Sequence, residues 1–164
     1  VGEEKESLSR VILPLYSERD GNVPLKSGLN QWNAGGRDRH EDEVYIQIPR
    51  WVQTRFPMFF PSRDIVFNLG LPDGRTLEAK PCQDGGELNG VKVGKALMSS
   101  PNKALGKWIL RDILKLVPGE VCTLEMLQEL GIDSVEVTKL SSKQYKINFA
   151  PLGAYEEFSN TYRL

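Results

Sequence analysis

The chain has 164 residues, of which 40% are apolar, with 21 Lys and Arg, 22 Asp and Glu, one His and two Cys. This size fits one globular domain, and no apolar run reaches the roughly 20 residues that span a bilayer. Two Cys form neither a zinc site nor a disulfide framework by themselves, a net charge of −1 argues against a uniformly basic nucleic-acid-binding protein, and one His excludes chemistry that needs two.

The first elements in chain order are a polar leader and short apolar segments. Residues 1–10 are polar and predict a linker. Residues 11–16 form an apolar run interrupted by Pro14, which predicts an edge strand because an edge tolerates a missing N–H. Residues 44–48 alternate in polarity and predict a half-buried strand. We expect the aromatic residues of the segment 56–61 to fill one end of the core.

The middle of the chain carries the clearest hairpin signal. Residues 65–71 and 75–80 are strand-like and flank Pro72-Asp73-Gly74, a typical turn sequence. Residues 83–90 contain three Gly and predict a flexible loop, which precedes another strand over residues 91–98.

Two helices are expected next. Ser100 predicts an N-cap with Pro101 at the first helical position. Apolar residues then recur at helical spacing and predict a buried stripe: Leu105, Trp108, Ile109, Ile113 and Leu116. Thr123 predicts the cap of a second short helix that ends at Leu130, with Gly131 directly after it.

The last segments, 134–140 and 144–149, alternate in polarity and predict two more strands. The pattern as a whole predicts one barrel-like antiparallel β domain over residues 11–164 with two short helices.

The near-zero net charge conceals a basic segment. Residues 91–115 contain six basic residues and one acid, a local charge of +5: Lys92, Lys95, Lys103, Lys107, Arg111, Asp112 and Lys115. A basic face of this kind attracts phosphates. The alternative is that these side chains are merely solvated on the outer face of an amphipathic helix.

The segment 27–39 is unusually rich in residue types that contact bases. Asn and Gln pair with adenine, Arg pairs with guanine, Asp accepts from the cytosine amino group, and adjacent Gly residues allow close approach. We predict DNA contacts for nine residues: Asn30, Gln31, Trp32, Asn33, Gly35, Gly36, Arg37, Asp38 and Arg39. The alternative is an ordinary exposed loop with Trp32 tucked into the core.

A second hypothesis is a Mg²⁺-dependent nuclease. Asp64, Glu78 and Lys80, with Asp73 between them, resemble a PD-(D/E)xK pattern, in which two carboxylates hold the metal and a Lys positions water. Asp73 lies at the tip of the predicted turn, however, and the motif is short and degenerate.

Two other groups have simpler interpretations. His40 and the acids that follow it, Glu41, Asp42 and Glu43, lie consecutively and do not converge on a metal, so we expect a solvated acidic face. Cys82 and Cys122 lack neighbouring His and are expected to be core thiols.

Two long stretches carry a family resemblance. GLNQWNAGGRDRHEDEVYIQIPR (residues 28–50) and GKALMSSPNKALGKWILRDIL (residues 94–114) resemble the B3-type DNA-recognition domain of bacterial restriction endonucleases. The similarity spans about residues 20–140. Within that group, the chain is most similar to enzymes that carry a phospholipase-D-like nuclease on the same polypeptide.

This resemblance implies a mainly β fold: an open, mostly antiparallel seven-stranded B3-like pseudobarrel with two short α-helices. It implies that two arms grip the major groove of double-stranded DNA. The first arm corresponds to residues 30–39, and the second arm corresponds to the loop with Gln83, Asp84 and Asn89 and continues through Lys95 to Ser100 and Asn102. Phosphate contacts are expected from Lys92, Lys95, Ser99, Ser100, Asn102 and Lys103.

The resemblance also implies a role. The HxK nuclease motif of the family is absent, so the chain is expected to be a non-catalytic recognition module without metal or cofactor. The leader would join it to a nuclease domain, and we expect it in the bacterial cytoplasm, with no membrane partner.

Overall fold

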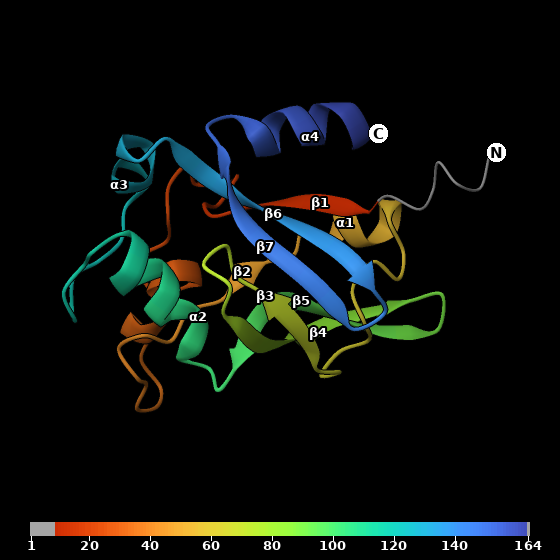
Figure 1. Cartoon of the computed structure of the whole chain (residues 1–164), viewed down its shortest axis with the longest axis horizontal. Helices are drawn as coiled ribbons and strands as arrows, with labels where there is room; N and C mark the ends of the chain where they lie inside the picture. The colour runs from red at the N-terminus through yellow and green to blue at the C-terminus, as the bar shows by residue number, and fades with distance from the viewer. Residues whose placement is uncertain (1–8, 164) are drawn as a thin grey trace.

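The computed structural model describes residues 9–163, and its strands form one seven-stranded sheet in the order β1-β6-β7-β3-β4-β5-β2 (Figure 1). The strands are β1 (Arg10–Pro14), β2 (Ile46–Gln47), β3 (Phe67–Gly70), β4 (Thr76–Leu88), β5 (Val91–Ser100), β6 (Ile132–Ser141) and β7 (Gln144–Pro151). Only the β3–β7 pair is parallel among these seven strands.

The sheet nearly closes on itself. β1 and β2 are its two ends, and the Gln47 Nε2 on β2 donates to the carbonyl oxygen of Tyr16, just past β1, at 2.7 Å. The predicted mostly antiparallel, seven-stranded pseudobarrel is therefore confirmed, with Pro14 on an edge strand as expected. Most of the predicted leader 1–10 lies outside the described residues, and Arg10 already begins β1.

Helices are more numerous than the two that the sequence predicted. They are α1 (Arg50–Arg55), α2 (Ala104–Gly106), α3 (Leu124–Glu129), α4 (Ala154–Tyr162), the 3₁₀ helix η2 (Gly28–Asn33) and the π-helix η3 (Lys107–Ile113). The C-terminal helix α4 lies over β1 and β6 at the top of Figure 1. The signal that could have found it is the aromatic stripe of Tyr155, Phe158 and Tyr162, which recur at helical spacing.

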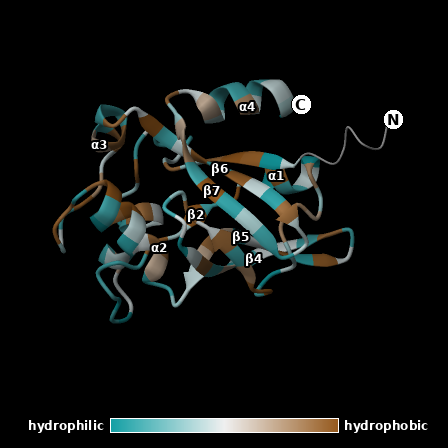
Figure 2. Ribbon diagram, viewed as in Figure 1, coloured by the Kyte–Doolittle hydropathy of each residue, from teal (hydrophilic) through white to brown (hydrophobic). Residues whose placement is uncertain are grey.

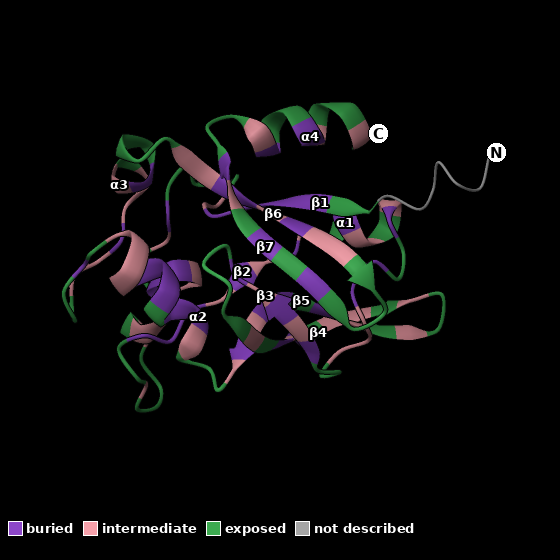
Figure 3. Cartoon of the chain, in the orientation of Figure 1, coloured by how far each residue is buried: buried purple, intermediate pink, exposed green. Residues whose placement is uncertain are grey.

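An aromatic cluster fills one end of the barrel. Phe56, Phe59 and Phe60 are buried, which confirms that the aromatics of residues 56–61 plug the core. The Phe60 ring stacks on Tyr145 of β7 with centroids 6.1 Å apart, and Tyr145 packs against Phe67 of β3 at 4.5 Å. Figures 2 and 3 show hydrophobic and buried residues along the strands and in the helical segment labelled α2, with polar, exposed residues over much of the connecting loops.

Both hairpins of the middle segment are formed, but one differs from expectation. Pro72-Asp73-Gly74 makes the predicted turn, with the Leu71 N–H donating to the Arg75 carbonyl oxygen at 2.7 Å. The prediction of a flexible loop over residues 83–90 is wrong, because β4 continues to Leu88. The turn is only Asn89-Gly90, both at positive φ, the pair of conformations that a two-residue type I′ turn requires.

The segment after β5 departs from a regular capped helix. β5 continues through Ser100, the Ser100–Pro101 peptide is cis, and α2 begins at Ala104, so the predicted N-cap at Ser100 is wrong. The predicted stripe is nevertheless buried along α2 and η3, where Leu105, Trp108 and Ile109 are at most 2% exposed.

The second predicted helix begins where expected. The Thr123 hydroxyl accepts from the Met126 N–H at 3.3 Å, which confirms its capping role. The helix ends at Glu129, and Gly131 follows at φ +77°.

Candidate nucleic-acid interface

The first predicted arm, residues 30–39, starts in η2 and continues as an irregular loop ahead of β2. Figure 1 shows this loop in orange at the lower left, and Figure 3 shows it largely exposed. We call residues 33–38 the arm tip and residues 41–44 the arm base.

Asn30 supports the arm from inside the fold. Its side chain is fully buried, and its Nδ2 donates to the carbonyl oxygens of Pro24 and Cys122, each at 2.8 Å. Its Oδ1 accepts from the Cys122 N–H at 2.8 Å. All of these bonds are internal, so Asn30 fastens η2 to the segment before α3 and offers nothing to a DNA groove.

Gln31 and Trp32 also turn toward the protein. Trp32 is partly buried and packs against the core, as the alternative interpretation of this loop expected. The Trp32 Nε1 and Gln31 Oε1 are buried and have no hydrogen-bond partner within the described part of the chain. The Trp32 Nε1 is therefore not available to a DNA groove.

The arm tip is open. Asn33, Gly35, Gly36, Arg37 and Asp38 are all exposed. A Cβ added to either Gly would meet nothing within 4 Å, and Gly36 adopts φ +94°. The tip therefore leaves space for a duplex to approach its backbone closely.

Glu43, in the arm base, gathers three predicted DNA-contacting residues. Its side chain is 1% exposed and accepts from Arg37 at 2.5 and 3.3 Å, from Arg39 at 3.1 Å and from the Asn102 Nδ2 at 3.2 Å. Arg39 also donates to the carbonyl oxygens of Ala34 and Gly35. Arg39 is only 16% exposed and acts as a brace that holds the tip against the base.

Asp42 fixes the arm base to the helical segment. It is 9% exposed and pairs with the Arg111 Nε of η3 at 2.7 Å. The expectation of a solvated face is therefore wrong for Asp42 and Glu43, because Asp42 pairs with the distant Arg111 and Glu43 pairs with Arg37 and Arg39 of the preceding loop. It also means that Arg111 is engaged by a carboxylate and does not add to a free basic face.

The junction between β5 and α2 lies beside the arm base. Ser99 is buried, donates to the Pro101 carbonyl oxygen and accepts from the Leu105 N–H, both at 2.8 Å, so it caps the chain internally. The Ala104 N–H also donates to the Pro101 carbonyl oxygen, at 3.2 Å. Asn102 and Lys103 are exposed.

The second predicted arm is the end of the β4–β5 hairpin. Gln83 and Asn89 adopt positive φ, and Asn89 is exposed at the turn. The carboxylate of Asp84 binds the Arg63 guanidinium and the Gly86 N–H, both at 2.9 Å. The Gly86 N–H and the charge of Arg63 lower the pKa of Asp84, which keeps it ionised.

Basic residues from three segments surround this hairpin end. Lys92 and Lys95 of β5 lie near Asp84, and Arg63 contacts it directly. Arg50, at the start of α1, donates to the Gly85 carbonyl oxygen at 2.7 Å. Charge counting along one segment missed Arg50 and Arg63, because only the fold brings them to the hairpin.

The two arms do not lie side by side. Asn102 follows the C-terminal end of β5 and contacts Glu43 of the first arm. Asn89 lies in the turn before the other end of β5. At about 3.3 Å per residue, the strand separates these ends by about 30 Å. Figure 1 shows the hairpin turn at the right and the arm at the lower left. The predicted phosphate contacts are accordingly divided between two regions.

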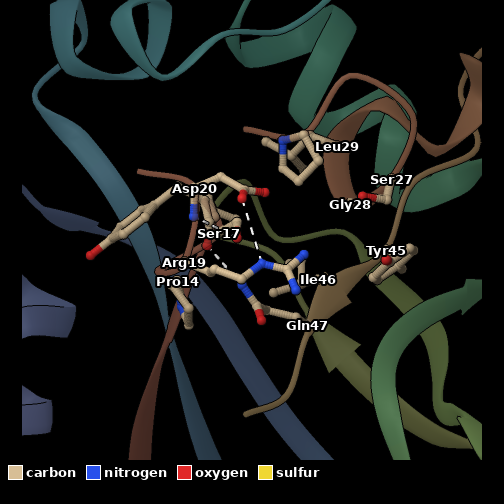
Figure 4. A pocket seen from close by; sticks show the side chains of 13 residues that line it. Pro14, Ser17, Arg19, Asp20, Ser27, Gly28, Leu29, Tyr45, Ile46 and Gln47 are labelled. Carbon is tan, nitrogen blue, oxygen red and sulfur yellow. Dashed lines mark hydrogen bonds and ion pairs between the residues drawn. The ribbon is translucent and has the colours of Figure 1, made fainter. Parts of the chain in front are cut away.

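A polar pocket of about 290 Å³ opens near the first arm (Figure 4). It is enclosed by the Ser17–Asn22 turn, the start of η2 and β2. Arg19 and Asp20 pair at 3.5 Å on one side, and Tyr45 and Gln47 lie on the other.

The nuclease hypothesis gains only one contact. The Lys80 Nζ lies 3.9 Å from the Asp64 Oδ1, but Asp73 binds Arg75 at the hairpin turn. Within residues 9–163, no three His, Cys, Asp or Glu side chains gather to hold a metal ion, and this includes the His40 region.

Comparison with known families agrees with this fold. The model of the NgoFVII C-terminal B3-like DNA-binding domain, from a restriction enzyme, matches residues 4–141. No curated protein matches the chain. Among the described residues, no helix is long and apolar enough to cross a membrane. Because the match covers most of the sequence and the seven-stranded pseudobarrel fits it, the chain belongs to the family of NgoFVII C-terminal B3-like DNA-binding domains.

Proposed function

We propose that this domain binds a short, specific double-stranded DNA site through the major groove. Family membership supports a DNA partner. The observation that carries the proposal is the exposed arm tip, where the side chains of Asn33, Arg37 and Asp38 carry donors and acceptors of the kind that pair with base edges. Without DNA, the Asn33 Nδ2 donates to the Leu25 carbonyl oxygen at 3.0 Å and Arg37 donates to Glu43, so both side chains would exchange these partners for a base. Gly35 and Gly36 let that tip approach closely.

The proposed contacts separate into two regions. At the first arm, Asn33, Arg37 and Asp38 contact bases, while Lys103 and the neighbouring Asn102 and Ser100 hold the backbone. At the hairpin end, Gln83 and Asn89 contact the duplex, and nearby cations hold phosphates: Arg50, Lys92 and Lys95. A separation of about 30 Å is close to one turn of B-DNA, about 34 Å, so one duplex can meet both regions.

Other predicted residues take supporting roles in this proposal. Asn30, Gln31, Trp32 and Ser99 shape the fold beneath the arm, because their polar atoms are buried or internally bonded. Arg39 braces the tip, and Asp84 orders the hairpin end.

We further propose that the domain is the non-catalytic recognition part of a bacterial restriction endonuclease. A nuclease domain on the same polypeptide would cut the DNA, in the bacterial cytoplasm. A plasmid-cleavage assay with Mg²⁺ tests this directly: cleavage by the purified chain that Glu78→Ala abolishes would support the nuclease hypothesis instead.

Selection of binding sites from a random duplex pool tests the recognition proposal. Repeated capture at near-physiological salt should enrich one short motif. Recovery of unenriched sequences would leave only electrostatic, non-specific binding and would overturn the proposal.

A further inference from the structure

Of the two arginines that were predicted to contact bases, only Arg37 has a guanidinium that is both ion-paired with a carboxylate and largely exposed to solvent. Its Nη2 and Nη1 reach the two carboxylate oxygens of Glu43 at 2.5 and 3.3 Å, so the guanidinium and the carboxylate meet as a two-pronged pair. The Arg37 side chain is 53% exposed, whereas that of Glu43 is 1% exposed. The pair therefore has a fixed, buried acceptor and a donor at the surface.

Arg39 binds the same carboxylate in a different way. It donates one bond to Glu43 and others to the Ala34 and Gly35 carbonyl oxygens, and it is 16% exposed. If Arg37 leaves, Arg39 and Asn102 still neutralise and hydrogen-bond the Glu43 carboxylate. The buried acid is thus not left unpaired, which would be the main cost of the exchange.

The acceptors of Glu43 resemble those of a guanine edge. A guanidinium fork binds two neighbouring acceptors, either the two oxygens of a carboxylate or the O6 and N7 of guanine in the major groove. While its Nη1 and Nη2 are on Glu43, Arg37 cannot present the same fork to a base. Glu43 and a guanine therefore compete for one donor pair.

We propose that Glu43 is a positioning residue that latches Arg37 until a guanine at the right place in the site replaces it. This inference rests on the proposed function. On non-specific DNA, a solvated phosphate offers Arg37 no better partner than Glu43, so Arg37 stays latched and contributes no phosphate contact. In the specific complex, the other contacts hold the guanine edge against the arm, and Arg37 exchanges partners. The latch thus lowers non-specific affinity and increases site preference.

Glu43→Gln tests the latch by removing the carboxylate while keeping the shape of the side chain. Binding is measured by fluorescence anisotropy, over a series of salt concentrations, on the duplex from site selection and on a scrambled duplex. We expect Arg37 to become free for phosphates, so the salt slope on the scrambled duplex steepens by about 0.9. The preference for the selected duplex should fall about tenfold, the scale of one base contact.

Arg37→Ala and the double variant identify the freed group. Arg37→Ala should leave affinity and salt slope on the scrambled duplex unchanged and lower the preference for the selected one. In Glu43→Gln/Arg37→Ala, the salt slope should return to that of the wild type. If the double variant keeps the steeper slope, the released cation is not Arg37 and the proposal is wrong.

Glu41→Gln is the matched control, because it removes an exposed negative charge from the same arm base without touching Arg37. If Glu41→Gln steepened the salt slope on the scrambled duplex by the same amount, the effect would come from net charge alone and the latch would be wrong. The latch would also be wrong if Glu43→Gln weakened binding to both duplexes equally and left the salt slope unchanged, because that result is expected of a residue that only braces the arm.

Circular dichroism verifies the fold of each variant, and Glu43→Asp replaces Glu43→Gln if the latter fails to fold. The side chain of Asp keeps the charge but is one methylene shorter, so its carboxylate no longer reaches Arg37 and the slope should steepen in the same direction. A wild-type chain that prefers neither duplex would instead refute the proposed function itself.

Discussion

Gly106 of α2 and Asp42 of the arm base are in direct backbone contact. A Cβ built on Gly106 would lie 1.7 Å from the Asp42 carbonyl oxygen, a distance no side chain can occupy. Asp42 also forms an ion pair with Arg111 of η3, more than one helical turn after Gly106. The arm is thus held to the barrel at its base by a glycine contact and a largely buried ion pair, while its tip stays open.

Gly106→Ala should displace the arm base and lower the free energy of unfolding by about 1–3 kcal/mol, the usual cost of overpacking. Urea unfolding followed by circular dichroism measures the change. Gly35→Ala is the control, since nothing lies within 4 Å of its Cβ position and its φ is not positive. Equal stability of Gly106→Ala and the wild type would show that the contact is not tight.

Asn30→Ala should reduce stability without altering DNA preference. It removes three internal hydrogen bonds and leaves the Cys122 N–H and carbonyl groups unsatisfied, at a cost of about 3 kcal/mol. Thermal unfolding and anisotropy on the selected and scrambled duplexes separate the two effects. If Asn30→Ala kept the stability of the wild type but lost the preference for the selected duplex, Asn30 would contact a base after all.

Lys103→Ala should weaken binding to all sequences alike. A phosphate contact carries no sequence information, so its loss should make the salt slope shallower by about 0.9 and leave the site preference unchanged. Lys146→Ala serves as the control, because β7 is three strands from β5 in the sheet. A change in the preferred motif on Lys103→Ala would contradict a phosphate role.

The domain should lose stability in alkali through its buried thiols. Cys82 and Cys122 are buried, as predicted, and desolvation raises the pKa of Cys122 from 9.0 to about 12 and that of Cys82 to about 11. Above pH 9 the unfolded chain loses protons that the folded chain keeps, so the unfolding free energy falls by up to about 1.4 kcal/mol per pH unit per thiol.

Urea unfolding at increasing pH tests this expectation. The unfolding free energy should be flat from about pH 7 to pH 9 and decline through the interval up to pH 11 and 12. Cys122→Ala should make the decline shallower, whatever its effect on stability at neutral pH. A decline of the same steepness in Cys122→Ala would assign the alkaline loss to other groups.

Local sequence rules predicted the parts of the fold that local contacts decide. Pro72-Asp73-Gly74 turns the chain, and Thr123 caps a helix, because the partner atoms in both cases lie within a few residues. The end of this hairpin was predicted wrongly because Gly85 and Gly86 indicated a loop. The turn is instead Asn89-Gly90, so both strands are longer than expected. Gly85 and Gly86 instead lie within β4, at a register shift between Asp84 and Glu87.

Distant partners decided which arm residues face outward. Asp42 meets Arg111 and Glu43 meets Asn102, 69 and 59 residues further along the chain. Asn30 meets Cys122 across 92 residues. No local pattern distinguishes such anchored polar residues from free ones, so composition located the arm and the fold selected its exposed tip.

The ratio of dissociation constants for the selected and scrambled duplexes, measured by anisotropy at one near-physiological salt concentration, tests specific recognition most directly. The account predicts that the selected duplex binds at least about a thousandfold more tightly, within the usual range for specific DNA-binding proteins. Equal affinity for the two duplexes would contradict specific recognition.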